Sequence, residues 1–388
     1  MLNNEFIYDN WNIHTKDEAT FADTLSDMTK NSVWEAGISS KNLRARALMG
    51  PIEGEMLVAS GKYNEAAVRD TCEGSRLMLQ YNGKEEFLRN CAFSGLLDAA
   101  RIKGGCFRDM PPEATSAVVN TALQYARGSS LLLHRGEKIT AVVSDAGNGY
   151  RVLEQDKLYS ILTDGIRSNG LGIPSFLGGS VDHEFTYAMM DLPTAQKALT
   201  KLYENALQSK GRKEELMPVV KFSTSDVRNS SATLVAGYRL ANRKDSFFTM
   251  VSPLKVDHRR SKVDGLTEFE GAVSRLYARF RDTEETIQAM SNTWIHYPLN
   301  AYILMTQKVG LAKKYAKDGY EDLERYTGGS ACSMYDLYMS MVLANETARK
   351  AGLKGLAMNN VEDMVAAVLA LNWTDFDVPG TVAWNTVA

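Results

Sequence analysis

The chain has 388 residues and a formal net charge of −3, and it is 44% hydrophobic and 23% charged. Soluble globular proteins average about 45–50% apolar and about 25% charged residues, so the composition excludes a disordered chain and a membrane-embedded one. The four cysteines form no Cys-x-x-Cys pair, which excludes a disulfide scaffold and favours a reducing compartment. The first residues do not resemble a signal peptide, so we expect a cytoplasmic protein with no membrane partner.

Residues 1–84 show no clear periodicity, and we treat them as an N-terminal segment of uncertain structure. Residues 84–102 carry an apolar stripe at helical spacing, which predicts a helix. Pro111 and Pro112 favour the start of a second helix, because proline suits the first helical turn. Two apolar runs on either side of residues 134–137 then predict a β-hairpin.

The middle of the chain predicts a mixed structure. Helical spacing recurs over residues 158–166 and again after Pro193, and residues 183–190 are typical of a strand. Three strand-like runs follow, joined by short polar loops, which favour antiparallel neighbours. The runs cover residues 219–225, 232–240 and 247–256.

A long helix over residues 269–280 follows these three strands. The order predicts an α+β fold in which helices pack on one face of an antiparallel β-meander sheet. From residue 292 onward the sequence predicts a helical C-terminal region, with Pro298 at the start of one helix. We therefore expect an α+β core over residues 85–291 and a helical region over 292–388.

A local basic cluster is the strongest feature of the sequence. Residues 255–281 contain seven lysines and arginines against four acidic residues, a net charge of +3 in a chain of −3. Basic side chains neutralise phosphates and release counterions, which is the main source of sequence-independent affinity for nucleic acids. The alternative is a solvated face of ion pairs, because Asp257, Asp264, Glu268 and Glu270 are interleaved.

A polar loop and three aromatic residues add to this hypothesis. The loop over residues 223–231 is either an anion cup with Arg228 as its charged partner, or a turn built by side-chain bonds to the backbone. Tyr238, Phe247 and Phe248 lie on the predicted sheet, where they offer stacking surfaces for unpaired bases. The candidate nucleic-acid-binding residues are Lys255, His258, Arg259, Arg260, Lys262, Arg275, Arg279 and Arg228.

Signals for catalysis, cofactors and metals are weak. The sequence has no Gly-x-Ser-x-Gly, no P-loop and no dinucleotide fingerprint behind a strand. Asp145 and Glu184 could hold a magnesium ion together only if their strands pair. His183 has no second histidine at the spacing of a transition-metal site. We therefore assign no catalytic residue, no cofactor and no metal ligand.

Four segments in order give the chain a family resemblance. They are residues 99–111, residues 141–145, residues 223–234 with His258 and Arg259, and residues 334–338 with Trp373. Together they resemble the phage/plasmid-like proteins that contain the domain of unknown function numbered 932, over roughly residues 85–378. This family usually has Ser-Asp-Arg-Tyr in the second segment, where this chain has Ser144-Asp-Ala-Gly-Asn-Gly-Tyr150. The resemblance implies a mobile element in a bacterial cytoplasm, but no settled activity.

These observations favour a non-enzymatic nucleic-acid-binding protein of a phage or plasmid, with single-stranded DNA or RNA as partner and strand binding or annealing as one form of this function. Two alternatives stay open. One is an interaction or virion-associated structural protein, which forms a homo-oligomer or binds a host protein. The other is a metal-dependent enzyme that acts on nucleic acid.

Overall fold

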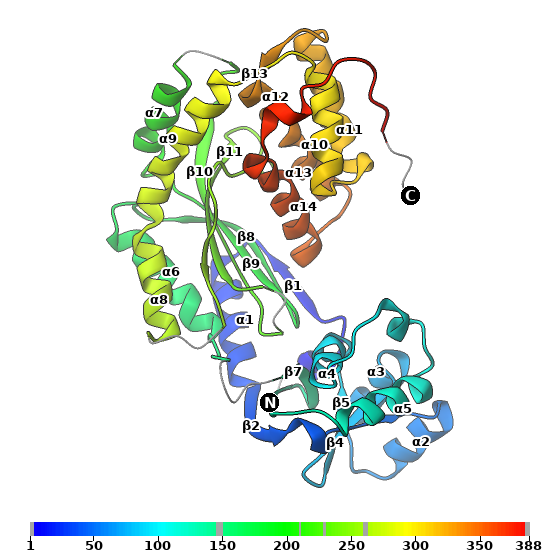
Figure 1. Cartoon of the computed structure of the whole chain (residues 1–388). Coiled ribbons are helices and arrows are strands. Elements are labelled where there is room, and N and C mark those ends of the chain that lie inside the picture. The colour runs from blue at the N-terminus through cyan, green and yellow to red at the C-terminus, as the bar shows by residue number, and fades with distance from the viewer. Residues whose placement is uncertain (1–3, 145–149, 209–210, 228–229, 259–262, 385–388) are drawn as a thin grey trace.

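The computed structural model describes residues 4–144, 150–208, 211–227, 230–258 and 263–384. Within these residues the chain forms two six-stranded sheets, a two-stranded sheet of β13 (Trp294–Ile295) and β14 (Cys332–Ser333), and a C-terminal group of helices (Figure 1). The fold is α+β, as the sequence predicts. In the described part of the chain, no helix is both long and apolar enough to cross a membrane.

The small lobe is built from residues 32–143 around a six-stranded sheet. Its strand order is β2 (Ser32–Ser39), β6 (Ser129–Arg135), β7 (Lys138–Val143), β5 (Lys84–Leu88), β4 (Leu77–Tyr81) and β3 (Arg44–Ala47). Every neighbouring pair is antiparallel except β5 and β7, which run parallel. The lobe also contains the helices α2 (Pro51–Ala59), α3 (Glu65–Glu73), α4 (Phe93–Ala99) and α5 (Pro112–Leu123).

The large lobe is built around a second six-stranded sheet, which is antiparallel throughout. Its order is β1 (Asn12–Thr15), β8 (Ser175–Asp182), β9 (Thr186–Asp191), β10 (Leu216–Thr224), β11 (Ala232–Leu240) and β12 (Leu254–Val256). Strands β10, β11 and β12 follow each other in the chain and in the sheet, so they form the predicted meander, although the third strand covers residues 254–256 rather than the predicted 247–256.

Five helices cover one face of this large sheet. They are α1 (Glu18–Lys30), α6 (Gln155–Ser168), α7 (Gln196–Leu207), α8 (Gly265–Ser274) and α9 (Leu276–Asn292). Their buried side chains share one core with every second residue of the strands, for example Val220 and Phe222 of β10. The residues between them point to the opposite face, where β9, β10 and β11 are also largely buried.

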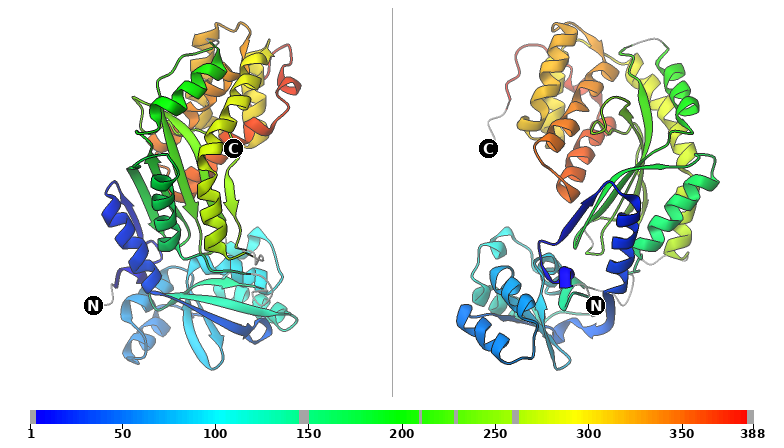
Figure 2. Two further views of the ribbon diagram at one scale, coloured as in Figure 1. Left: turned by 90° about the vertical axis from the view of Figure 1, so that its left-hand side faces the viewer. Right: turned by 180° about the vertical axis from the view of Figure 1, so that it is seen from behind.

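The C-terminal region is helical, as the sequence predicts, and lies beside the opposite face of the large sheet (Figures 1 and 2). Its helices are α10 (Pro298–Val309), α11 (Lys313–Thr327), α12 (Met334–Met341), α13 (Leu343–Lys350) and α14 (Gly355–Ala367). Pro298 begins α10, as expected for a proline in the first turn. Leu356 at the start of α14 packs against the apolar residues on this face of the sheet.

Two predicted elements differ in the structure. Residues 84–88 form strand β5 rather than the start of a helix, because Asn82 and Gly83 both adopt positive φ angles and close a two-residue hairpin with β4. The helix predicted over residues 269–280 is divided at Arg275 into α8 and α9. The boundaries predicted after residues 84 and 291 also differ from those of the two lobes. Residues 12–30 belong to the large lobe, and residues 84–143 belong to the small lobe.

Candidate nucleic-acid interface

A cavity of about 1040 Å³ lies between the meander strands and the helices α9 and α14. We call it the central cavity. Its walls come from three parts of the chain that are far apart in sequence. The strands and their loops contribute Ser223, Ser230, Ser231 and Lys255, while α9 contributes Arg279 and α14 contributes Asn359 and Asp363.

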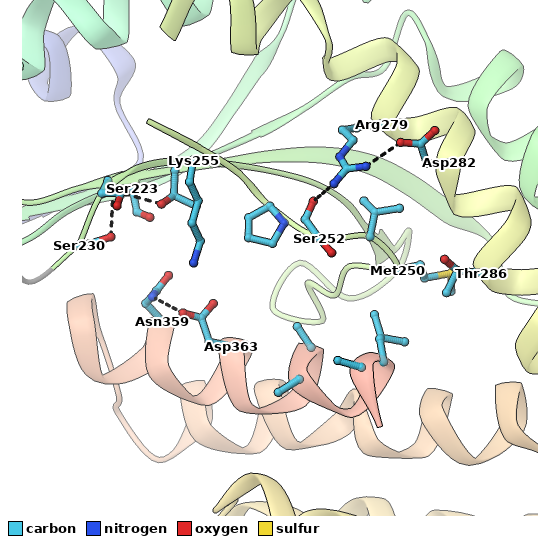
Figure 3. Close-up of a pocket in the computed structure, with 18 of the residues that line it drawn as sticks. Ser223, Ser230, Met250, Ser252, Lys255, Arg279, Asp282, Thr286, Asn359 and Asp363 are labelled. Atoms are coloured by element: carbon cyan, nitrogen blue, oxygen red, sulfur yellow. Dashed lines mark hydrogen bonds and ion pairs between the residues drawn. The ribbon is translucent and has the colours of Figure 1, made fainter. Parts of the chain in front are cut away.

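Lys255 is the exposed residue in the middle of the short strand β12. Figure 3 shows its side chain pointing from the strand towards α14, where Asn359 and Asp363 face it. No salt bridge joins the Lys255 ammonium to another described residue, so a ligand can approach it as a free cation.

Arg279 reaches the same cavity from α9, but its charge is already partly compensated. Its guanidinium donates to a carboxylate oxygen of Asp282 at 2.7 Å and to the carbonyl oxygen of Ser252 at 3.0 Å. The second bond ties α9 to the segment that leads into β12, so Arg279 also positions the cavity wall (Figure 3).

The lining of the central cavity carries both signs of charge. Lys255 and Arg279 face three carboxylates, those of Asp282, Glu285 and Asp363. Between them lie serine hydroxyls and the amides of Asn359 and Asn360. The lining therefore offers both hydrogen-bond donors and hydrogen-bond acceptors. Such a lining suits a nucleotide, which has an anionic phosphate and a base with polar edges, better than a ligand that carries only negative charge.

The candidate residues predicted from the sequence have four different positions. Lys255 and Arg279 line the central cavity, whereas Arg275 is exposed at the junction of α8 and α9 and bonds to the carbonyl oxygen of Gly271. His258 is buried. Arg228, Arg259, Arg260 and Lys262 lie outside the described residues.

The assignment of His258 as a nucleic-acid contact is wrong for a physical reason. Its ring stacks on that of Tyr150 at a centroid distance of 5.1 Å, and Nδ1 lies 3.2 Å from the carbonyl oxygen of Arg151. Burial lowers the pKa of the imidazole, which favours the neutral ring. A buried, neutral histidine cannot neutralise a phosphate.

The stacking surface predicted from Tyr238, Phe247 and Phe248 is also not available. All three side chains are at most 1% exposed. Tyr238 packs edge-on against Phe280 of α9, within the core beneath the helix-covered face. These rings therefore stabilise the packing around the sheet. A base in the central cavity would contact other side chains.

The polar loop over residues 223–231 has a role that its sequence did not indicate. The carboxylate of Asp226 accepts a 2.6 Å bond from the buried guanidinium of Arg135, which belongs to the small lobe. Val227 packs against Leu131 and Leu133 of the same lobe. The loop thus joins the two lobes at one end and borders the central cavity at the other, through Ser230 and Ser231.

The metal hypothesis gains no support from the described residues. Asp145 lies outside them. Asp182 accepts bonds from the backbone amides of Glu184 and Phe185 at 2.7 and 2.8 Å, a turn that occupies one of its oxygens. Within the ranges given above, no three His, Cys, Asp or Glu side chains are grouped so that they could hold a metal ion.

Sequence reasoning missed the contribution of α14 to the central cavity. Asn359, Asn360 and Asp363 lie about a hundred residues after Lys255 and belong to no recognisable motif. Only the packing of α14 against the sheet brings them to the cavity. No family model, curated protein or solved structure matches the chain.

Proposed function

We propose that the chain is a nucleic-acid-binding protein that holds an unpaired strand in the central cavity. The observation that supports it best is that Lys255 and Arg279, two members of the predicted basic cluster, line one cavity beside Ser230 and Ser231. In this proposal Lys255 contacts a phosphate.

The polar groups on α14 give the proposed site a means of contacting bases. Single-stranded nucleic acids are recognised through exposed base edges, which carry both donors and acceptors. The Asp363 carboxylate accepts hydrogen bonds from amino groups and the Asn360 amide both donates and accepts, whereas the Asn359 amide is already bonded to Lys221 at 2.9 Å and to Asp363 at 3.1 Å. The carboxylates would be unfavourable in a site for phosphates alone, whereas they suit a nucleotide with its base turned towards α14.

The resemblance to phage/plasmid-like proteins supports the wider setting of this proposal. In that setting the protein belongs to a phage or plasmid and acts in the cytoplasm of the bacterial host, by binding or annealing single strands. This part of the proposal depends on the four sequence segments alone, because the comparisons add no relative.

The test is the affinity for fluorescein-labelled oligo(dT), measured by anisotropy over a series of salt concentrations. We expect Lys255→Glu to weaken binding by about tenfold or more and to make the salt dependence shallower, because a phosphate contact is lost. The matched control is Lys201→Glu, since Lys201 is an exposed residue of α7 on the other side of the sheet. Equal affinities of the wild type and Lys255→Glu would contradict the proposal.

One observation favours the alternative of a protein-interaction role. Ile52 and Met56 of α2 are 80% and 68% exposed, and they lie one turn apart on the small lobe. Exposed apolar side chains on one face are typical of protein contacts. A wild type that does not bind oligo(dT), but self-associates through a contact that Ile52→Glu abolishes, would favour this alternative.

A further inference from the structure

A second cavity, of about 490 Å³, lies on the other side of α14 from the central cavity. We call it the basic pocket. Its floor is formed by β8 and β9, and its rim includes the start of α14. None of the residues that line the basic pocket lines the central cavity, so phosphate binding in this pocket is independent of strand binding there.

Cations dominate the rim of the basic pocket. Lys16, Lys244 and Lys354 are exposed, and none of them makes a salt bridge within the part of the chain that the structure describes. Asp245 is the acidic residue of the lining, and the remaining cation, Arg349, is paired with Glu362. The three lysines and Asp245 together give the rim a net charge of +2, although the chain as a whole has a net charge of −3.

The N-terminus of α14 opens on this pocket without a capping side chain. Lys354 occupies the N-cap position in an extended conformation, and no side-chain hydrogen bond caps the described first turn. The first amide groups of a helix have no partner within the helix, and the helix dipole places partial positive charge there. A helix of 13 residues with a lysine at its N-cap is thus arranged to attract an anion.

Ser180 is an independent sign that the pocket receives a ligand. This residue of β8 is only 6% exposed and lines the pocket, yet its hydroxyl has no hydrogen-bond partner among the described residues. It lies in register with His14 of β1 and Tyr187 of β9, so the three side chains share the face of the sheet below α14. Buried hydroxyls are normally bonded, and a ligand oxygen would satisfy this one.

We propose that the basic pocket binds a phosphate group, held by Lys16, Lys354, the amides at the start of α14 and the Ser180 hydroxyl. Lys244 adds charge at the rim from the loop after β11. The nearest further carboxylate is that of Asp182: its Oδ1 is bonded to the backbone of its own turn, and its Oδ2 would lie 3.5 Å from a Cβ atom on Gly355 at the start of α14. Burial and the neighbouring Lys354 lower the pKa of His14, so that its neutral ring leaves the charge to the lysines.

The phosphate group has two possible sources, and the experiment separates them. One is a free phosphate or mononucleotide, and the other is a phosphodiester of the strand that passes α14. The probes are inorganic phosphate, followed by titration calorimetry, and labelled oligo(dT), followed by anisotropy. The variants are the pair Lys16→Gln with Lys354→Gln, and separately Ser180→Ala, while Lys197→Gln with Lys201→Gln on α7 is the matched control.

We expect the Lys16/Lys354 variant to bind inorganic phosphate about tenfold more weakly or worse, because it loses two charge-assisted bonds. Ser180→Ala should weaken binding by a smaller factor, and the α7 control should bind as the wild type does. If inorganic phosphate does not bind but the Lys16/Lys354 variant loses affinity for oligo(dT), the source is the strand.

Three results would overturn the proposal. The first is a wild type that does not bind phosphate, together with an affinity for oligo(dT) that the Lys16/Lys354 variant retains. The second is an equal loss in the α7 control, which would indicate a general charge effect. The third is an unchanged phosphate affinity in Ser180→Ala, which would place the ligand outside this pocket.

Discussion

His258 shows how far burial changes the role of a single side chain. In the sequence it stands beside Arg259 and Arg260, and the three read as one basic run. In the structure its ring lies against Tyr150 and bonds to the backbone of Arg151. His183 is a second case, since it bonds to the carbonyl oxygen of Tyr8 and burial again lowers its pKa. Both rings are therefore neutral structural groups rather than surface charges.

These two histidines predict an acid-sensitive fold. Their pKa values are lowered in the folded state, so below about pH 6.5 the unfolded chain takes up protons that the folded chain does not. Stability is complete above that pH and falls as the pH decreases. His258→Asn should reduce this fall by up to about 1.4 kcal/mol per pH unit, as measured by urea unfolding at several pH values. A variant with the same pH dependence as the wild type would contradict the role given to His258.

At the scale of elements, α14 is held on the large sheet by a buried ionic group. Lys221 of β10 is 2% exposed and donates to Glu362 at 2.7 Å and to Asn359 at 2.9 Å. Arg349 of α13 pairs with the other oxygen of Glu362 and donates to the Tyr187 hydroxyl at 2.8 Å. The group separates the central cavity from the basic pocket, because Asn359 lines the first and Arg349 the second.

Removing the shared carboxylate should therefore destabilise the protein strongly. Glu362→Ala leaves the buried Lys221 and the partly buried Arg349 without their acid, and loss of one partner of a buried pair costs about 3–5 kcal/mol. Adding Lys221→Met to Glu362→Ala should recover part of this loss, because one unpaired charge disappears. The control is Glu321→Ala, whose exposed pair with Lys317 should contribute less than about 1 kcal/mol. Similar free energies of unfolding for Glu362→Ala and the control would refute this role.

At the scale of the molecule, buried polar groups join the two lobes. Arg135 of the small lobe bonds to Asp226 of the large one. Arg89 of the small lobe donates to the carbonyl oxygens of Phe6 and Ile7, in the segment that precedes β1. Gly136 allows that segment to pass, since a Cβ atom there would lie 2.2 Å from the oxygen of Phe6. These buried polar groups, together with the packing of Val227 against Leu131 and Leu133, fix the relative position of the lobes.

Asp226→Ala should loosen this connection. The Arg135 guanidinium, which is 1% exposed, would lose its anionic partner at a cost of about 3 kcal/mol. We expect a wider distribution of lobe distances in small-angle X-ray scattering and faster proteolysis between the lobes, while the far-ultraviolet circular dichroism stays the same. Asp27→Ala, in an exposed pair with Lys30, should change neither measurement. A scattering profile identical to that of the wild type would show that other contacts suffice.

Local patterns determined much of the secondary structure and the fold class. The strands on either side of residues 134–137, the meander and the helices that begin near Pro112, Pro193 and Pro298 follow from periodicity and from proline at the first helical turn. The hairpin at Asn82 and Gly83 was equally readable from the sequence, although the apolar stripe after it favoured a helix.

Tertiary structure alone decided which polar residues meet. The sequence placed Lys255 and His258 in one basic run, yet packing exposes the first to a cavity and buries the second. It gave no sign that Asp226 joins two lobes or that Lys354 and Ser180 face one pocket. Periodicity reports which face of an element is apolar, whereas a site depends on contacts between distant segments, and those are fixed only when the sheets and helices pack.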